Sequence, residues 1–183
     1  MSITVDLSIS ESLSGSMESG DDGVPQAESP EPESAQTVVS LPVSVLPDLS
    51  LLQSWAWAAY LDKTPAIVSL LINSAAEMRE LNKQYRGKDR ATNVLSFPMQ
   101  SPEEVDICLL GDIVLCAEVI SQEAQQQSKT EQSHWAHMVV HGMLHLQGYD
   151  HIDDDEARIM EQLEIKILKQ IGIDSPYQIS PGE

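Results

Sequence analysis

The chain has 183 residues, enough for one ordinary domain with a hydrophobic core and too few for two comfortable ones. Its formal net charge of −19 argues against the broadly basic surface that nucleic-acid-binding proteins usually carry. The charge is uneven, because residues 1–62 hold ten Asp or Glu and no Lys or Arg. We therefore expect a single domain over residues 1–183 whose basic residues are confined to its later part.

Nothing in the sequence resembles a targeting signal or a membrane span. The N-terminus MSITVDLSIS lacks a basic region, and no apolar run approaches the roughly 18 residues that a transmembrane helix needs. Cys108 and Cys116 lie in an apolar stretch that is typical of a buried strand, which argues against a disulfide or a cysteine metal site. The sequence predicts a cytoplasmic protein without membrane contact.

The first third of the chain contains two ordered elements separated by an acidic segment. Apolar and polar residues alternate over 2–9, as in a half-buried strand. From about 10 to 36 the sequence is rich in Ser, Gly, Glu, Asp and Pro, which predicts a disordered insertion. Residues 50–61 are expected to form a helix that is capped by Ser50 and buries both of its tryptophans.

Short apolar runs alternate with amphipathic segments along the rest of the chain. The expected strands are 66–72, 93–98 and 109–116, and the expected helices are about 75–85 and 117–127. Ser128 and Glu131 have the spacing of a capping box, which predicts the start of a helix that runs through the histidines. Asp153 and Glu156 repeat this spacing before a last helix. Its expected buried face consists of Ile159, Leu163, Ile167 and Ile171. The pattern predicts an α+β domain in which a small sheet is flanked by helices.

Three histidines stand in the segment HGMLHLQGYDH at spacings of four and six residues. On a helix, His141 and His145 are about 6 Å apart on one face, so both imidazoles can bind one ion. Gly148 can adopt a positive φ, end the helix and bring His151 back toward the same point. Three neutral nitrogen ligands leave the fourth position of a zinc ion to water, which is the catalytic arrangement. The spacing therefore predicts one hydrolytic Zn²⁺ on a helix and the turn that follows it.

Nearby polar residues have less specific interpretations. His134 and His137 lie one and two turns upstream and either contact substrate or are ordinary helix residues. Asp150 either accepts a hydrogen bond from a ligand imidazole or simply stabilises the turn.

Half of the basic residues downstream of residue 62 fall within residues 79–90. They are Arg79, Lys83, Arg86, Lys88 and Arg90, and with two acids they give this window a charge of +3. Arginine suits the stabilisation of charge on a phosphoryl group, although a solvated turn explains the same composition equally well.

The histidine spacing also matches that of metzincin peptidases. In the HExxH motif of such enzymes, the residue after the first histidine is the glutamate that acts as general base. Here that position is Gly142, which has no side chain to accept a proton. A peptidase is therefore the less favoured alternative.

Three blocks of sequence in order resemble the bacterial YbeY family of metal-dependent endoribonucleases. They are LNKQYRGKDRATNVLSFP (81–98), LLGDIVLC (109–116) and HWAHMVVHGMLHLQGYDHIDDDEARIMEQLE (134–164), within a match over about residues 66–176. The resemblance implies a small mixed sheet flanked by helices, zinc bound by His141, His145 and His151, and RNA cleavage that depends on Arg86. The main departure from the family is the acidic insertion.

The expected function is single-strand-specific endoribonuclease activity in ribosomal RNA processing, late in 3′-end maturation of the small-subunit RNA, and in ribosome quality control. Expected substrate contacts, less firmly indicated than Arg86, come from Lys83, Lys88, Arg90 and His137. The resemblance implies the small ribosomal subunit and its factors as partners, with no role for DNA. The remaining alternatives are the metallopeptidase and a non-catalytic, zinc-containing factor bound to the ribosome.

Overall fold

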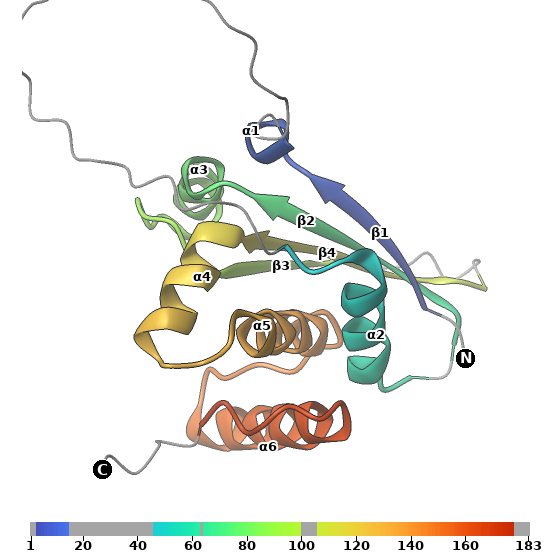
Figure 1. Ribbon diagram of the computed structural model, residues 1–183. Helices are drawn as coiled ribbons and strands as arrows, with labels where there is room; N and C mark the ends of the chain where they lie inside the picture. Colours follow the sequence, from blue (N-terminus) through green and yellow to red (C-terminus); the bar gives the residue numbers. More distant parts are fainter. Residues whose placement is uncertain (1–2, 15–45, 63, 100–105, 178–183) are drawn as a thin grey trace, which may run out of the picture.

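The computed structural model describes residues 3–14, 46–62, 64–99 and 106–177, in which a four-stranded sheet is flanked by helices (Figure 1). The strands are β1 (Ile3–Ile9), β2 (Ala66–Asn73), β3 (Val94–Pro98) and β4 (Cys108–Cys116). The helices are α1 (Glu11–Ser14), α2 (Leu49–Ala59), α3 (Ala75–Arg86), α4 (Ala117–Gln126), α5 (Glu131–Leu146) and α6 (Asp154–Gln170).

The sheet has the strand order β1-β2-β4-β3 and is mixed. β1 and β4 both run parallel to the central strand β2, whereas β3 pairs antiparallel with β4 at one edge. β2 alternates buried and partly buried residues along its whole length, as expected for a strand covered on one face more than on the other. The prediction of an α+β fold with a small mixed sheet is confirmed.

The helices are distributed unequally over the two faces of the sheet. In Figure 1, α2, α4 and α5 lie on one side of the sheet and α3 lies on the other, while α6 forms a further layer beyond α5. α5 contacts β3, β4, α2, α4 and α6, so it is the central helix of the main hydrophobic core. None of the described helices has both the length and the apolar character needed to cross a bilayer.

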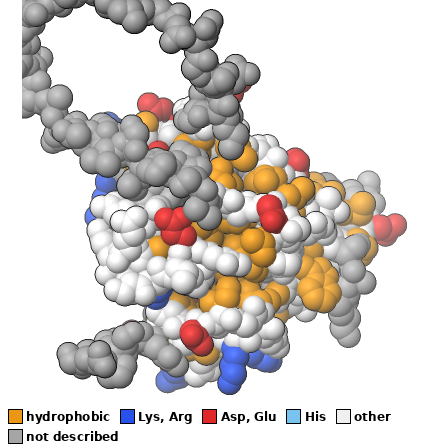
Figure 2. Space-filling view, in the orientation of Figure 1, with side chains coloured by type: hydrophobic (Ala, Val, Ile, Leu, Met, Phe, Trp, Pro, Cys, Tyr) orange, Lys and Arg blue, Asp and Glu red, His pale blue; other side chains and the backbone are white. Residues whose placement is uncertain are grey.

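Helix α2 begins one residue earlier than expected and has a different cap. Asp48, rather than Ser50, is the N-cap, and its carboxylate accepts a hydrogen bond from the amide of Leu51 at 2.9 Å. The prediction that both tryptophans are buried was wrong for one of them, because Trp55 is 3% exposed but Trp57 is 56% exposed. Figure 2 shows apolar side chains gathered on this face of the molecule, where α2 and β1 lie.

The acidic insertion predicted over residues 10–36 falls mostly outside the described residues. At its start, residues 11–14 form the short helix α1, contrary to the expectation of disorder. Leu13 is buried in the main core, and burial of this apolar side chain offsets the entropy cost of ordering the turn. The remainder of the insertion, and the extent of the domain over residues 1–183, stay predictions.

Helix α5 is capped by Thr130 and not by the predicted Ser128. The Thr130 hydroxyl accepts a hydrogen bond from the amide of Ser133 at 3.1 Å, whereas Ser128 has a φ of 54° and precedes the cap. Glu131 is the first helical residue, and its carboxylate accepts a hydrogen bond from Ser121 of α4. A capping box over 128–131 would require Ser128 to be the cap, which its position excludes.

We expect Thr130→Ala to lower the free energy of unfolding by about 1 kcal/mol, because an orphan amide of α5 loses its acceptor. Ser128→Ala serves as the matched control and should change that free energy by less than about 0.5 kcal/mol. Urea denaturation of the metal-free proteins measures both values. A larger loss in the Ser128 variant would contradict this assignment of the cap.

Helix α6 starts as predicted, and of its predicted apolar stripe Ile167 is buried while Leu163 and Ile171 are partly buried against the core. The Asp153 carboxylate accepts hydrogen bonds from the amides of Asp155 and Glu156, which confirms it as the cap. The predicted apolar stripe was wrong at its first position, where Ile159 is 51% exposed. The buried residues of α6 are Met160, Glu164, Ile167 and Leu168. The true stripe is shifted by one residue and includes an acidic side chain.

Candidate metal centre

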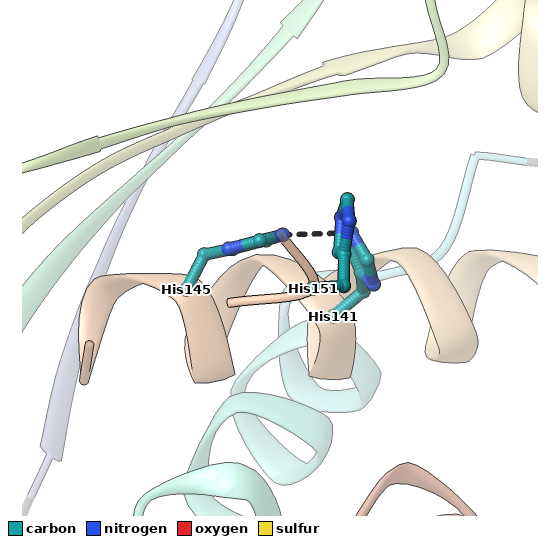
Figure 3. Close-up of side chains that lie close together, drawn as sticks. All are labelled: His141, His145 and His151. Atoms are coloured by element: carbon teal, nitrogen blue, oxygen red, sulfur yellow. Dashed lines mark hydrogen bonds between the residues drawn. The ribbon is translucent and has the colours of Figure 1, made fainter. Parts of the chain in front are cut away.

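The three histidines of the HGMLHLQGYDH segment come together at the C-terminal end of α5. His141 and His145 lie one turn apart on this helix, which ends at Leu146. Gly148 follows with a φ of 89°, a left-handed conformation that favours glycine, and the chain turns back there. The predicted role of Gly148 in ending the helix is confirmed, and His151 is returned to the two helical histidines (Figure 3).

The geometry of this histidine triad (His141, His145 and His151) suits a single metal ion. One ring nitrogen from each residue lies within 4.8 Å of the others, and the Nε2 atoms of His141 and His145 are 3.0 Å apart. Tetrahedral Zn²⁺ with Zn–N bonds of about 2.0–2.1 Å places its nitrogen ligands roughly 3.3 Å from one another. Small rotations of the imidazoles therefore suffice to bind the ion, and the all-nitrogen donor set fits zinc chemistry.

The environment of His145 keeps its imidazole neutral. Burial first, and then the neighbouring imidazoles of His141 and His151, lower the pKa of His145 to about 4. A neutral imidazole is the form that binds metal, so this ring needs no deprotonation at neutral pH. Asp150, considered above as a partner of a ligand imidazole, places Oδ1 3.8 Å from His145 Nδ1 and also accepts a hydrogen bond from the amide of His151.

A buried carboxylate lies directly behind the triad. Glu164 of α6 is fully buried, and its Oε1 lies 2.7 Å from Nδ1 of His141. Its Oε2 lies 3.3 Å from Nε2 of His137 and accepts a hydrogen bond from the hydroxyl of Tyr177. Burial alone would raise the pKa of Glu164, but the hydrogen bonds from His137 and His141 outweigh burial and hold it well below its ordinary value. Glu164 is therefore an ionised acceptor beside a candidate metal ligand.

Glu164 was missed in the sequence because the buried stripe of α6 was assigned one residue out of register. With the stripe placed correctly, an acidic residue stands between Met160 and Ile167 on the face that packs toward α5. An ionisable residue at a core position requires a partner, and that requirement was the available signal.

The two upstream histidines have different surroundings. His134 is 2% exposed, and its Nε2 lies 2.7 Å from a carboxylate oxygen of Glu123 in α4, so it joins two helices. The His137 side chain is 12% exposed and bonds to Glu164. Neither residue is among those that line the cleft at the triad. The substrate contact expected of His137 stays a prediction.

The triad lies at one wall of a cleft of about 540 Å³. The lining residues are Arg86, Lys88, Thr92, Asn93, Val94, Ser96, His141, His145, Asp150 and His151. Arg86 reaches it because it is the last residue of α3, which ends at Gly87 with a φ of 68°. The structure thus brings the arginine and the histidines, 55 residues or more apart in the sequence, into one cleft.

The other basic residues of the 79–90 window are placed differently. Asp89 binds Arg79 at 2.7 Å and Lys83 at 3.2 Å. These hydrogen bonds, from Arg79 first, lower the pKa of Asp89 to about 2. Lys83 is therefore paired outside the cleft lining, and Arg90 is exposed and also lies outside that lining. Of the four predicted basic contacts, the cleft contains Arg86 and Lys88.

Gly142 has a structural role in addition to its missing side chain. A Cβ atom at this position would lie 2.8 Å from Cγ2 of Ile113 in β4, which is too close for a normal contact. The helix packs against the sheet here, so a glutamate would require the Ile113 side chain or α5 to shift. The packing therefore disfavours the glutamate base of an HExxH peptidase at this position.

Comparisons with known proteins concern the family to which the chain is related. Residues 50–172 match the model of the family described as Endoribonuclease YbeY. The chain is 49% identical over 140 residues to the Endoribonuclease YbeY of Idiomarina loihiensis, which covers 74% of this chain and 86% of the relative. It is also 27% identical to TM1509 from Thermotoga maritima, whose solution structure aligns with a TM-score of 0.43 over 73% of this chain and 87% of that one.

Proposed function

The chain belongs to the YbeY family of endoribonucleases, and from this premise we propose that it is a zinc-dependent enzyme that cuts single-stranded RNA. The observation that carries the proposal is the cleft in which Arg86 and the histidine triad meet. The physiological substrate we propose is ribosomal RNA, late in 3′-end maturation of the small-subunit RNA and in quality control of ribosomes. Such a role places the protein in the cytoplasm.

The residues of the cleft have separate roles in the proposed hydrolysis of a phosphodiester. His141, His145 and His151 would hold the zinc ion, which would supply Lewis-acid chemistry and lower the pKa of a bound water to about 7. Arg86 offers a planar fork of donors to the phosphate, which neutralises the charge that develops on its oxygens during displacement. Lys88 adds a second positive charge in the same cleft. Thr92 and Ser96 supply hydroxyl groups that can orient the RNA backbone.

The charge distribution supports a ribosomal partner. The whole chain carries −19, and Arg79 and Lys83 of the basic window 79–90 are both paired with Asp89. Long-range attraction of free RNA is therefore weak. A small ribosomal subunit, or a factor bound to it, would bring the RNA to the protein, so that long-range electrostatic attraction is not needed.

Chelation of the purified protein tests the proposal. We expect wild-type protein to cleave a single-stranded RNA, to lose that activity after treatment with chelator, and to regain it when one equivalent of Zn²⁺ is added. Metal analysis should give one zinc per chain. A duplex of the same sequence, incubated in parallel, should be cut much more slowly.

Two other results would favour the alternatives. Chelator-sensitive hydrolysis of casein without RNA cleavage would favour the metallopeptidase alternative, despite the close contact that a side chain at Gly142 would make. A metal that raises the melting temperature, with no RNA cut even when ribosomal subunits are present, would indicate a non-catalytic ribosome-associated factor.

A further inference from the structure

We propose that Glu164 and Tyr177 are positioning residues that hold His141 in the tautomer and orientation required for metal binding. This inference rests on the metal centre of the proposed function. It assigns to the C-terminal segment, distant from the cleft in sequence, a part in setting the affinity of the site for its ion.

The hydrogen bond between Glu164 and His141 fixes the tautomer. Glu164 Oε2 already accepts the Tyr177 hydroxyl and Oε1 lies 2.7 Å from Nδ1 of His141, so the carboxylate is placed as the acceptor of both groups and the proton of His141 is assigned to Nδ1. The Nε2 atom of His141, 3.0 Å from Nε2 of His145, then carries a lone pair directed toward the triad. Metal-binding histidines commonly show this carboxylate contact, which also raises the basicity of the ligand nitrogen.

Tyr177 fixes the carboxylate itself. The two oxygens of Glu164 have separate partners, because Oε2 receives both the Tyr177 hydroxyl and the His137 ring while Oε1 faces His141. Rotation of the carboxylate would break all three contacts. Removal of the tyrosine hydroxyl eliminates one of the two hydrogen bonds that hold Oε2. The carboxylate that accepts the hydrogen bond from His141 is then less fixed in orientation.

The segment that carries Tyr177 is tied to the rest of the protein before it reaches Glu164. After α6 ends, the Ile173 amide donates to the carbonyl of Leu168 at 2.9 Å. The Lys129 ammonium donates to the carbonyl of Pro176 at 2.7 Å. These contacts anchor residues 173–176 on both sides of the turn, so the Tyr177 hydroxyl is delivered to Glu164 at low additional entropy cost.

His137, His141 and Glu164 could instead form a second metal site, because one donor atom from each lies within 4.8 Å of the others. Such a site requires His141 to give up its Nδ1 proton while Tyr177 still occupies Glu164 Oε2. When His137, His141 and Tyr177 each donate a hydrogen bond to Glu164, the hydrogen-bonding capacity of the buried carboxylate is satisfied without a metal ion. Zinc stoichiometry separates the two interpretations, because positioning predicts one ion per chain.

The test is a measurement of zinc affinity by competition with a chromogenic chelator, together with the visible spectrum of the Co²⁺-substituted proteins. We expect Glu164→Gln to weaken zinc binding by about 10- to 100-fold, as loss of such a partner usually does. Tyr177→Phe should weaken it by about tenfold or less, because the hydroxyl acts one contact further away. Both variants should alter the Co²⁺ spectrum, which reports ligand geometry rather than stability.

Matched controls come from equivalent contacts elsewhere in the chain. Glu123→Gln alters the carboxylate beside His134 of α5, and Tyr60→Phe removes a hydroxyl that donates to the Thr64 carbonyl at 2.9 Å. Neither should change zinc affinity by more than about twofold. Because Tyr177 is 44% exposed, its variant should fold even if Glu164→Gln does not.

Each outcome decides between the two proposals. Wild-type affinity and an unchanged Co²⁺ spectrum in both variants would overturn the positioning role alone, leaving the metal centre intact. Two zinc ions per wild-type chain, with one lost in Glu164→Gln, would also overturn it in favour of a second metal site. Absence of zinc binding in the wild type would overturn this inference and the proposed function together.

Discussion

Replacing His145 by alanine is expected to abolish both zinc binding at stoichiometric concentration and cleavage of single-stranded RNA. The triad has three nitrogen donors, and the loss of one leaves an incomplete set. The affinity should therefore fall by more than the roughly 10- to 100-fold that removal of an outer partner costs. Metal analysis after gel filtration and single-turnover cleavage measure the two effects, and activity should fall to that of chelated wild type.

His134→Gln is the appropriate control for this variant, because it also alters a histidine of α5 with a carboxylate partner but lies outside the triad. It should retain one zinc per chain despite some loss of stability. Added zinc should raise the melting temperature of this control and of the wild type, but not that of His145→Ala. Full zinc occupancy in His145→Ala would exclude the triad as the metal centre.

Replacing Arg86 by alanine is expected to lower kcat/KM for RNA by about 10²- to 10³-fold without loss of zinc. The guanidinium lies in the cleft with the triad but is no metal ligand, so its removal takes away charge stabilisation alone. Arg86→Lys should recover only part of the activity, because an ammonium group cannot offer paired donors to a phosphate. Steady-state kinetics and zinc analysis on the same preparations test this separation.

Arg79→Ala provides the control for charge. It removes the same formal charge from α3, but Arg79 is engaged by Asp89 and is not among the residues that line the cleft. Its kcat/KM should stay within about threefold of wild type. Similar losses in the Arg79 and Arg86 variants would mean that general electrostatic attraction, not a specific contact, explains the requirement for arginine.

The features predicted well from the sequence depend on residues close together in the chain. His141 and His145 lie on the same face because they are one helical turn apart. His151 returns to them because Gly148, which precedes it, allows the chain to turn back. The helix expected over about 75–85 is likewise observed as α3, and the structure shows that a capping box at Ser74 and Glu77 and the left-handed Gly87 set its bounds. These local rules placed most elements within one or two residues of their observed limits.

The features that were missed depend on contacts between distant segments. Asp89 pairs with both Arg79 and Lys83, and no periodicity in the sequence shows which acid folds back onto which base. Glu164 meets His141 only because α6 packs on α5. Trp57 was expected to be buried like Trp55 yet is 56% exposed. Tertiary packing decides these cases, and local propensity does not encode it.

The ion pairs of Asp89 have a consequence for how RNA binding should respond to ionic strength. With Arg79 and Lys83 engaged by Asp89 outside the cleft lining, Arg86 and Lys88 are the lining bases of the cleft that remain available to phosphates. Two phosphate contacts release few condensed counterions, which corresponds to a slope of about −1.4 in a plot of log K against log salt for a single strand. Binding by this protein should thus be weak but tolerant of salt, as suits an enzyme that acts on RNA already held in place within a larger particle.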